Sequence, residues 1–260
     1  MFLMKNGYIT ANSAIAAFAL EKSTERRDQL EGLKLQTGDS DPSALDDTTR
    51  GVDFLSRLTV AQNADPEFMT DQRILTIAIS LINAGSDTTA ISLSSLFYHL
   101  LKHPSKYRKL MAELDSAIAK GIITPEDGLV SWPDAQKLVY LDACIQESFR
   151  VFPAAGLLLE RYVPKGGATI CGERIPGGTI VGCNAWVLHR RPEIFGKDVD
   201  EFRPERWLEA NAAQLKEMKG AMFQFGAGPR TCIGRNISVL EIYKLVPSFL
   251  RKFEVSSFLQ

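Results

Sequence analysis

The feature that most constrains the fold is a long apolar stretch over residues 74–101. A helix of that length can cross a bilayer, but Asp87 and several amide and hydroxyl side chains lie near its middle, where a membrane makes them costly. We therefore predict a long buried helix of a water-soluble body. Thr70 or Asp71 can cap its start, and Pro104 ends it because the residue before a proline resists the helical conformation.

The remaining sequence predicts a mainly α-helical chain with a small β region. Between Leu157 and Cys183, short apolar runs separated by glycine and proline indicate two or three short strands. The stretch that follows is rich in loop residues up to Gly228. Apolar periodicity predicts helices over residues 11–35, 48–61, 105–120, 133–151, about 210–219, and from about 232 to 252.

Composition disfavours several classes of function. The chain has 30 Lys and Arg residues against 31 Asp and Glu residues, so its near-zero net charge disfavours nucleic acid and anionic membranes as partners. A small molecule is the expected partner. The N-terminus shows no signal pattern, and we expect no transmembrane or signal segment in this chain.

Cysteine usage points to at most one chemical role. Cys144, Cys171, Cys183 and Cys232 form no C-x-x-C pair and no zinc-type spacing, which favours a reducing compartment over a disulfide framework.

Residues 225–234, with the sequence FGAGPRTCIG, carry the strongest chemical signal. Two glycines and a proline predict a tight turn in which backbone amides approach a ligand, followed directly by a helix. Cys232 then lies at a helix N-terminus, which favours the thiolate that binds metals. The alternative is a buried structural cysteine behind a glycine turn.

Two further segments are weaker signals when taken alone. Residues 84–89, AGSDTT, place a glycine, an acid and hydroxyls inside the long helix, which predicts a kink or a bound water; an ordinary helix that carries Ser and Thr is the alternative. Glu147 and Arg150 are neighbours at i, i+3 spacing and otherwise read as a surface ion pair. The sequence Pro-Glu-Arg-Trp over residues 204–207 provides a second arginine.

These segments, in this order over residues about 70 to 252, resemble the cytochrome P-450 family. The pattern F-x-x-G-x-R-x-C-x-G of residues 225–234 matches the family's haem-binding signature at each defining position. The resemblance implies the C-terminal half of the cytochrome P-450 fold, with residues 1–260 forming a partial domain that lacks the N-terminal half and the extreme C-terminus.

The resemblance also implies haem b as cofactor, with Cys232 as the ligand of its iron. By it, Arg230 contacts a haem propionate and Phe225 lies against the thiolate side. Arg161 resembles a second propionate contact, although a surface residue is an equal alternative there. The other cofactor-contacting positions are Gly226, Gly234 and Ala84.

Further roles follow from the same resemblance. Asp87 and Thr88 correspond to the catalytic residues that relay protons and hold dioxygen. Residues 154–159 approach the substrate side. The buried structural triad corresponds to Glu147, Arg150 and Arg206. His189 is expected to be a structural or surface residue, and His99 and His103 to be ordinary.

The implied function is insertion of one oxygen atom from O2 into a small organic substrate, a secondary metabolite, with electrons from a separate NADPH-cytochrome reductase. Residues 164–207 and the Arg-Asn-Ile-Ser after Gly234 resemble fungal pisatin-demethylase-type members. A full-length relative is expected on the cytosolic face of the endoplasmic reticulum membrane, attached through an N-terminal anchor that this chain lacks.

Two alternatives remain open. One is a truncated, catalytically incompetent fragment or haem-binding remnant, and we expect the isolated chain to bind haem poorly because part of the pocket wall is missing. The other is a thiolate-haem isomerase or dehydratase, which the acid and alcohol of Asp87 and Thr88 disfavour.

Overall fold

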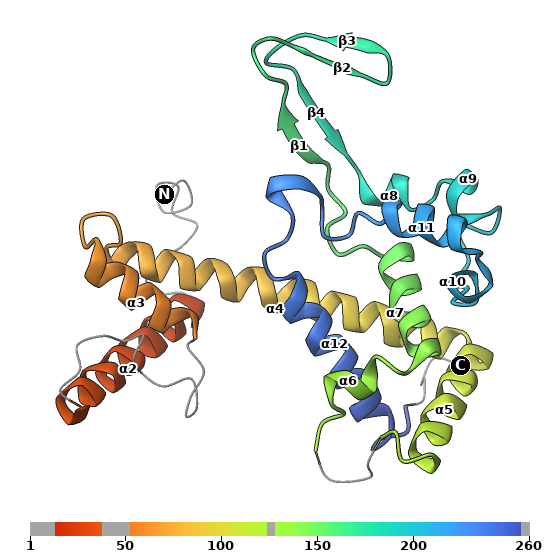
Figure 1. The fold of residues 1–260 in the computed structure, drawn as a ribbon, viewed down its shortest axis with the longest axis horizontal. Coiled ribbons are helices and arrows are strands. Elements are labelled where there is room, and N and C mark those ends of the chain that lie inside the picture. The colour runs from red at the N-terminus through yellow and green to blue at the C-terminus, as the bar shows by residue number, and fades with distance from the viewer. Residues whose placement is uncertain (1–13, 38–52, 124–127, 256–260) are drawn as a thin grey trace. The chain divides into compact units, whose positions relative to one another are not determined.

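A computed structural model describes residues 14–37, 53–123 and 128–255 of the chain (Figure 1). The starts of the first two predicted helices, residues 11–13 and 48–52, lie outside the described residues. The fold is mainly helical with a small β region, as predicted. The helices are α2 (Ala14–Thr37), α3 (Phe54–Ala64), α4 (Asp71–Lys102), α5 (Pro104–Ala119), α6 (Trp132–Ala135), α7 (Val139–Val151), α8 (Ala185–Leu188), α9 (Pro192–Phe195), α10 (Arg206–Glu209), α11 (Ala212–Ala221), the 3-10 turn η2 (Gly228–Arg230) and α12 (Arg235–Leu250).

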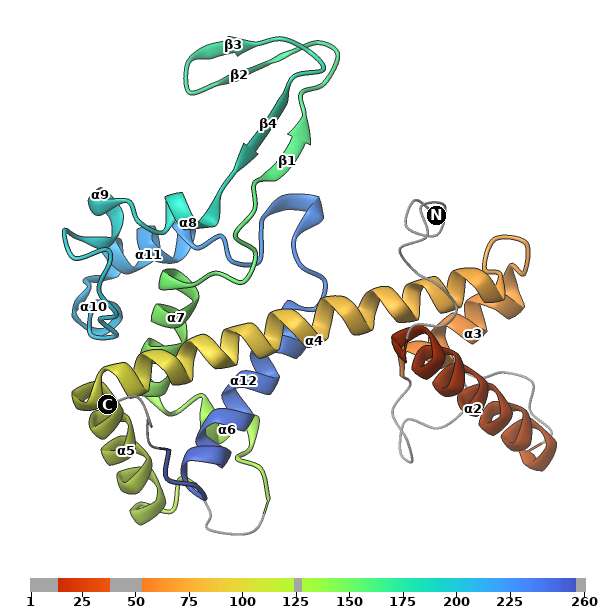
Figure 2. The ribbon, with the colours of Figure 1, turned by 180° about the vertical axis from the view of Figure 1, so that it is seen from behind.

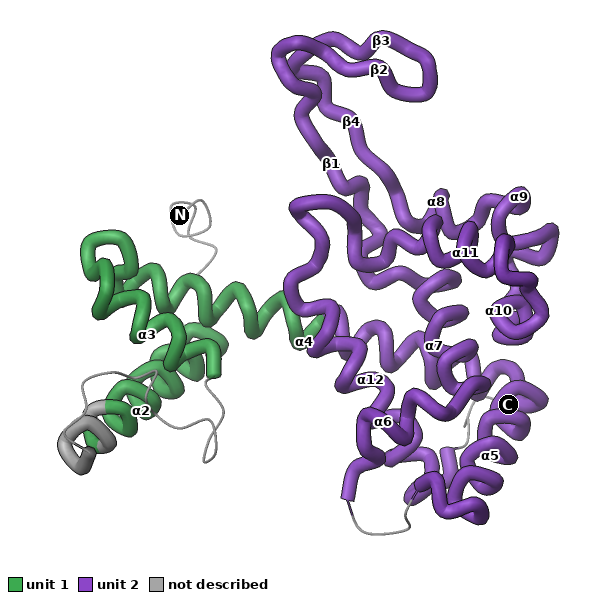
Figure 3. The backbone as a smooth tube through the Cα atoms, viewed as in Figure 1, with its two compact units in different colours: residues 1–87 green, residues 88–260 purple. Residues whose placement is uncertain are grey.

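The chain forms two compact units, residues 1–87 and residues 88–260 (Figure 3). In the first unit, apolar side chains of α2 and of the first part of α4 make the core: Ala16, Ala19, Ala78 and Ile79. In the second unit, the last part of α4 packs with α5, α7 and α12 around Leu96, Leu100, Leu110, Leu114, Leu141, Ile145, Ile242 and Val246.

Helix α4 begins and ends where the sequence predicts. The Thr70 hydroxyl accepts a hydrogen bond from the Arg73 amide at 3.3 Å, and Pro104 opens α5 immediately after α4 ends. The helix continues without interruption through Gly85. A single glycine costs a helix only about 1 kcal/mol, which the neighbouring turns outweigh.

The prediction that α4 is buried is wrong for much of its length. Among the helices of the described residues, α4 is the one that is long and apolar enough to cross a membrane. Of its most apolar 18-residue window, 17% is buried in the structure. Residues 83–88 are all exposed. The buried positions of α4 lie on either side of this exposed stretch, at residues 74–79 and at residues 89–100.

Two pairs of hydroxyl groups join α4 to its neighbours within the second unit. Thr89 donates to Ser238 of α12 at 3.2 Å, and Ser148 of α7 donates to Ser95 at 3.1 Å. All but Ser238 are nearly inaccessible to solvent. Views from the two sides show α7 and α12 beside this part of α4 (Figures 1 and 2).

Four strands form two antiparallel pairs, where the sequence predicted two or three strands. β1 (Leu159–Tyr162) pairs with β4 (Ile180–Cys183), and β2 (Ala168–Ile170) pairs with β3 (Glu173–Ile175). The second pair lies between β1 and β4 in sequence, so one hairpin continues the other (Figure 1). Cys171 and Gly172 have φ of 51° and 86°, as the two-residue turn between β2 and β3 requires.

Residues 133–151 were predicted as one helix, but they form the separate helices α6 and α7. Glu113 of α5 stabilises the new start: its carboxylate accepts the amides of Tyr140 at 2.7 Å and Leu141 at 2.9 Å. These are first-turn amides that have no partner inside a helix. The short helices α8, α9 and α10 were also missed, and α12 begins at Arg235 instead of near residue 232.

The Glu113 carboxylate is expected to contribute measurably to stability. Glu113→Ala removes both bonds to the start of α7 and should lower the free energy of unfolding by about 1–2 kcal/mol, as for other lost helix caps. Urea unfolding followed by circular dichroism measures this. Asp115→Ala, an exposed acid on the same helix, is the matched control and should leave stability unchanged. Equal effects of the two substitutions would contradict the capping role.

Candidate functional site

The segment that carries Cys232 is a loop closed by its own backbone. The Cys232 amide donates to the Phe225 carbonyl at 2.8 Å, and the Thr231 hydroxyl donates to the same carbonyl at 3.3 Å. Gly226 and Gly228 both have φ of 68°, a conformation that costs other residues free energy. The glycines and the closing bond therefore fix where the thiol lies.

The Cys232 side chain is a free, exposed thiol. It lies two residues before Gly234, the N-cap of α12, so the thiol stands just before the N-terminus of that helix. A Cβ atom on Gly234 would lie 3.9 Å from the Cys232 sulfur, so the glycine leaves that side of the sulfur bare. The predicted alternative, a buried structural cysteine, does not fit this exposure.

The loop is held at its first residue. The Phe225 ring packs edge-on against Phe149 of α7, with ring centres 5.5 Å apart. The guanidinium of Arg235 lies 5.6 Å from the centre of the same ring. Gly226 lies against Leu159 of β1, since a Cβ on Gly226 would be 3.4 Å from its side chain. The loop thus rests on α7, β1 and α12.

The surroundings of Cys232 suit a ligand that is largely apolar and carries negative charge. Ile233 and Leu157 are more than four-fifths exposed, which leaves apolar surface on and near the loop. Arg230 is exposed, and its side chain makes no hydrogen bond or ion pair with the other described residues. No three His, Cys, Asp or Glu side chains of the described residues gather to chelate a metal ion. Cys232 offers a metal one sulfur donor, and a haem would fit that donor set because it needs few ligands from the protein.

A cavity of about 440 Å³ adjoins the buried side of the loop. Cys232 is not among the residues that line it. It is lined by Trp132, Gln146, Phe149, Gln224, Phe225, Arg235, Asn236, Val239, Leu240 and Tyr243.

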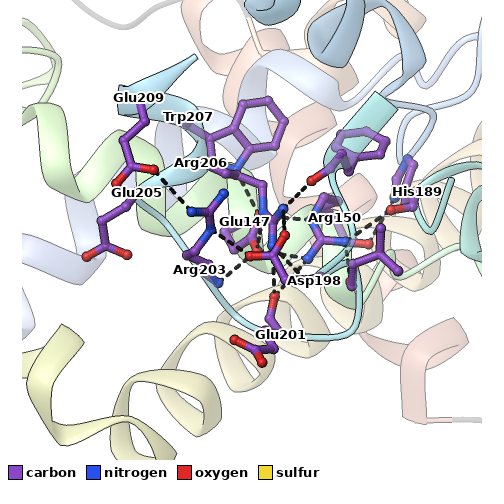
Figure 4. Close-up of polar contacts among 12 residues, drawn as sticks. Glu147, Arg150, His189, Asp198, Glu201, Arg203, Glu205, Arg206, Trp207 and Glu209 are labelled. Carbon is purple, nitrogen blue, oxygen red and sulfur yellow. Dashed lines mark hydrogen bonds and ion pairs between the residues drawn. The ribbon is translucent and has the colours of Figure 1, made fainter. Parts of the chain in front are cut away.

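A fully buried carboxylate, Glu147, organises the charged cluster at the end of α7 (Figure 4). One oxygen accepts from Arg150, Arg206 and the Arg203 amide at 2.8, 2.9 and 2.9 Å. The other accepts from Arg150 and from the Trp207 indole, both at 2.9 Å. These five hydrogen bonds offset the free energy lost when the carboxylate is removed from water. Without them a buried carboxylate would be strongly destabilising.

Arg150 is equally complete. Besides its two bonds to Glu147, its guanidinium donates to the carbonyls of His189, Val199 and Glu201 at 3.0, 2.6 and 2.9 Å. All five guanidinium donors are thus used. The cluster ties α7 to residues about fifty positions later in the chain.

Arg206 joins Glu147 to a second acid, Asp198, whose carboxylate it contacts at 3.0 Å. It also donates to the backbone carbonyls of Phe195, Asp198 and Glu201. The structure therefore brings Glu147, Arg150 and Arg206 together. The sequence alone did not indicate the contributions of Asp198 or of the Trp207 indole.

The other predicted residues lie as follows. Arg161 is exposed on β1 and donates to the Glu160 carbonyl at 2.7 Å. Ala84 and Asp87 are exposed on α4 in the first unit, and Thr88 is exposed where the second unit begins.

His189 is fully buried, so the surface alternative considered for it is wrong. The other two histidines lie together with Phe202: its ring stacks on His99, with centres 4.8 Å apart, and on His103, at 5.6 Å.

The model of the cytochrome P-450 family matches residues 4–258. The chain therefore belongs to the cytochrome P-450 family. It is 47% identical over 244 residues to a cytochrome P-450 monooxygenase of Aspergillus terreus, which covers 94% of this chain and 47% of that protein. It is 46% identical over 209 residues to one of Emericella nidulans, covering 80% and 41%.

A pisatin demethylase of Fusarium vanettenii is also similar, at 45% identity over 174 residues, covering 67% of this chain and 32% of the relative. The predicted resemblance to this fungal group is confirmed. The chain spans less than half the length of each of these three relatives.

Removing the central carboxylate should destabilise the second unit. Glu147→Gln keeps the shape but leaves two buried guanidinium groups short of negative charge, so we expect a loss of about 3–5 kcal/mol in stability. Chemical denaturation measures it. Lys137→Ala, which removes only an exposed partner of Asp134, is the control and should have no resolvable effect. A Glu147→Gln variant as stable as the wild type would show that the cluster is dispensable.

Acid should destabilise the protein through His189. Burial lowers its pKa from 6.5 to about 4; the hydrogen bond to the Arg150 carbonyl opposes the shift, and the charges of Arg150 and Arg190 assist it. Between pH 6.5 and 4 the unfolded chain binds a proton that the folded chain does not, so stability falls as pH falls through that range. The loss reaches up to about 3 kcal/mol.

Unfolding midpoints measured across this pH range test the effect. The slope should flatten in His189→Gln, which cannot titrate. An unchanged slope in that variant would assign the acid sensitivity to other groups.

Proposed function

We propose that this chain is the haem-binding part of a cytochrome P-450 monooxygenase in which Cys232 is the protein ligand of the haem iron. The observation that carries the proposal is the exposed thiol of Cys232 on a loop fixed by two left-handed glycines and by the bond from its own amide to Phe225. A thiol in that setting is both accessible and held in one place. Iron binding requires the thiolate form.

The remaining cofactor contacts are assigned on charge and space. The exposed guanidinium groups of Arg230 and Arg161 provide cations for the two propionates of haem b. Gly234 leaves room for a flat ring beside the sulfur, Gly226 is assigned to the same ligand, and Phe225 anchors the loop on Phe149.

A thiolate-ligated haem supplies the electron density that promotes cleavage of the O–O bond of dioxygen. The chain's own part in that reaction is to deliver protons. The Thr88 hydroxyl both donates and accepts hydrogen bonds, and the neighbouring Asp87 carboxylate can exchange a proton with solvent because it is exposed. We assign proton delivery to these two residues.

We further propose a small organic substrate, a secondary metabolite, with electrons from a separate NADPH reductase on the cytosolic face of the endoplasmic reticulum membrane. The near-zero net charge and the similarity to a pisatin demethylase support a small-molecule substrate. The acid and hydroxyl at Asp87 and Thr88 favour reduction of dioxygen over isomerase or dehydratase chemistry, which needs no such proton delivery.

The test is the absorption spectrum of the reduced, carbon monoxide-bound protein. It is recorded on the chain and on the chain joined to the N-terminal half of the Aspergillus terreus relative, since the chain matches 47% of that protein. We expect the spectrum of a thiolate-ligated haem, strong in the joined protein and weak in the chain alone. Cys232→Ser should abolish it, because an alcohol does not replace a thiolate on iron.

Cys171→Ser is the matched control, because Cys171 is also an exposed thiol. It should leave the spectrum unchanged. A thiolate spectrum that survives Cys232→Ser contradicts the proposal, whereas haem binding without NADPH-dependent oxidation would favour a haem-binding remnant.

A further inference from the structure

His189 follows α8 and lies fully buried between the charged cluster and the cysteine loop. One ring nitrogen, Nδ1, lies 3.1 Å from the Arg150 carbonyl oxygen. The other, Nε2, accepts a hydrogen bond from the Phe223 amide at 2.8 Å. The His189 carbonyl in turn accepts from the Arg150 guanidinium at 3.0 Å (Figure 4). His189 and Arg150 therefore hold each other by two separate bonds.

These partners leave the His189 ring a single protonation state. A carbonyl oxygen only accepts, so Nδ1 must carry a proton; a backbone amide only donates, so Nε2 must not. Only the neutral imidazole with its proton on Nδ1 satisfies both. Addition of a proton to Nε2 would place two donors face to face at the Phe223 amide and a second positive charge beside Arg150.

The bond to Phe223 is the first of a short series that ends at the thiol-bearing residue. The Phe223 carbonyl accepts the Gly226 amide at 2.9 Å, and the Phe225 carbonyl accepts the Cys232 amide at 2.8 Å. The segment that leads into the cysteine loop is thus fixed to the His189 ring on one side. On its other side it closes onto Cys232.

We propose that His189 is a positioning residue for Cys232, whose neutral ring fastens residues 223–226 to the Arg150 carbonyl and so holds the cysteine loop in one conformation. The inference rests on the proposed function in one respect: the position of Cys232 matters because its sulfur binds iron. The role goes beyond support of the fold, because one of its two bonds points to the loop and not to the charged cluster.

Two variants separate the bond to the loop from the bond to the cluster. His189→Gln keeps an oxygen near the Nε2 position that can accept the Phe223 amide. His189→Asn is shorter; it keeps a donor near the Nδ1 position for the Arg150 carbonyl but does not reach Phe223. The cysteine loop should therefore lose its fixed conformation in His189→Asn and keep it in His189→Gln.

The main readout is amide hydrogen exchange on the chain without haem. In His189→Asn the amides of Phe223, Gly226 and Cys232 should exchange about tenfold faster than in the wild type, the change expected for one lost buried hydrogen bond. The amide of Leu114, buried in α5, is the internal control and should not change. In His189→Gln the three amides should stay near the wild-type rate.

A measurement on the wild type needs no variant to fold. Nitrogen-15 spectra of the His189 ring distinguish the two neutral forms, and we expect the proton on Nδ1 at neutral pH. A proton on Nε2, or a charged ring, would overturn the proposal. The proposal would also be overturned if amide exchange in His189→Asn were accelerated equally at Leu114 and at the loop amides, because that would indicate a general loss of stability.

The loaded protein provides a functional readout. In the joined protein, His189→Asn should lower the fraction of haem that shows the thiolate spectrum, and His189→Gln should restore it. Exchange rates do not depend on haem, so failure of the Cys232→Ser test would leave the exchange result standing. If the loop amides of His189→Asn exchange at the wild-type rate and the joined protein still shows the thiolate spectrum, the role of His189 is rejected and that of Cys232 is kept.

Discussion

The buried carboxylate of Glu147 is the interaction on which the second unit depends. A charge at that depth is tolerated only because five donors surround it. Those donors come from α7 and from residues 203–207, which belong to a region of short helices and loops. The charge acts there together with a small apolar cluster that includes Phe195, Trp207 and Met218. It fixes the place of a segment whose regular structure is too short to fix itself.

That arrangement places the candidate chemistry beside a rigid cluster. Arg150 uses every donor it has, so the end of α7 has little freedom to move. Phe149, its neighbour in the same helix, packs against Phe225 at the start of the cysteine loop. A residue that must hold a metal gains from such support, because the ligand atom then needs little reorganisation when it binds.

Much of the fold was predictable because its signals are local. The ends of α4 and the start of α5 follow from Thr70 and Pro104, which act on their own neighbours in the chain. The loop around Cys232 is equally local, since glycine and proline fix the backbone where they stand. The break between α6 and α7 was not predictable, because Glu113 caps α7 from another helix and nothing within residues 133–151 announces it.

In the candidate site, too, local contacts were predictable and contacts between distant segments were not. The i, i+3 spacing brings Glu147 and Arg150 together within one helix, whereas the approach of Asp198 and Trp207 depends on how distant segments fold. Pairing Glu147 with Arg206 required the order of motifs typical of the family. The exposure of residues 83–88 on α4 could not be predicted either, because an apolar helix gives no local sign of which faces its own chain will cover.

The hydroxyl pairs that join α4 to α7 and α12 restrict which substitutions this sequence can accept during evolution. Replacing only Thr89 by valine leaves Ser238 without its partner, and replacing only Ser95 by alanine does the same to the buried Ser148. Exchanging both members of a pair for apolar residues of similar size avoids that penalty. In related sequences the two members of each pair should therefore change together. Such correlated substitutions would link positions on helices that are far apart in the sequence.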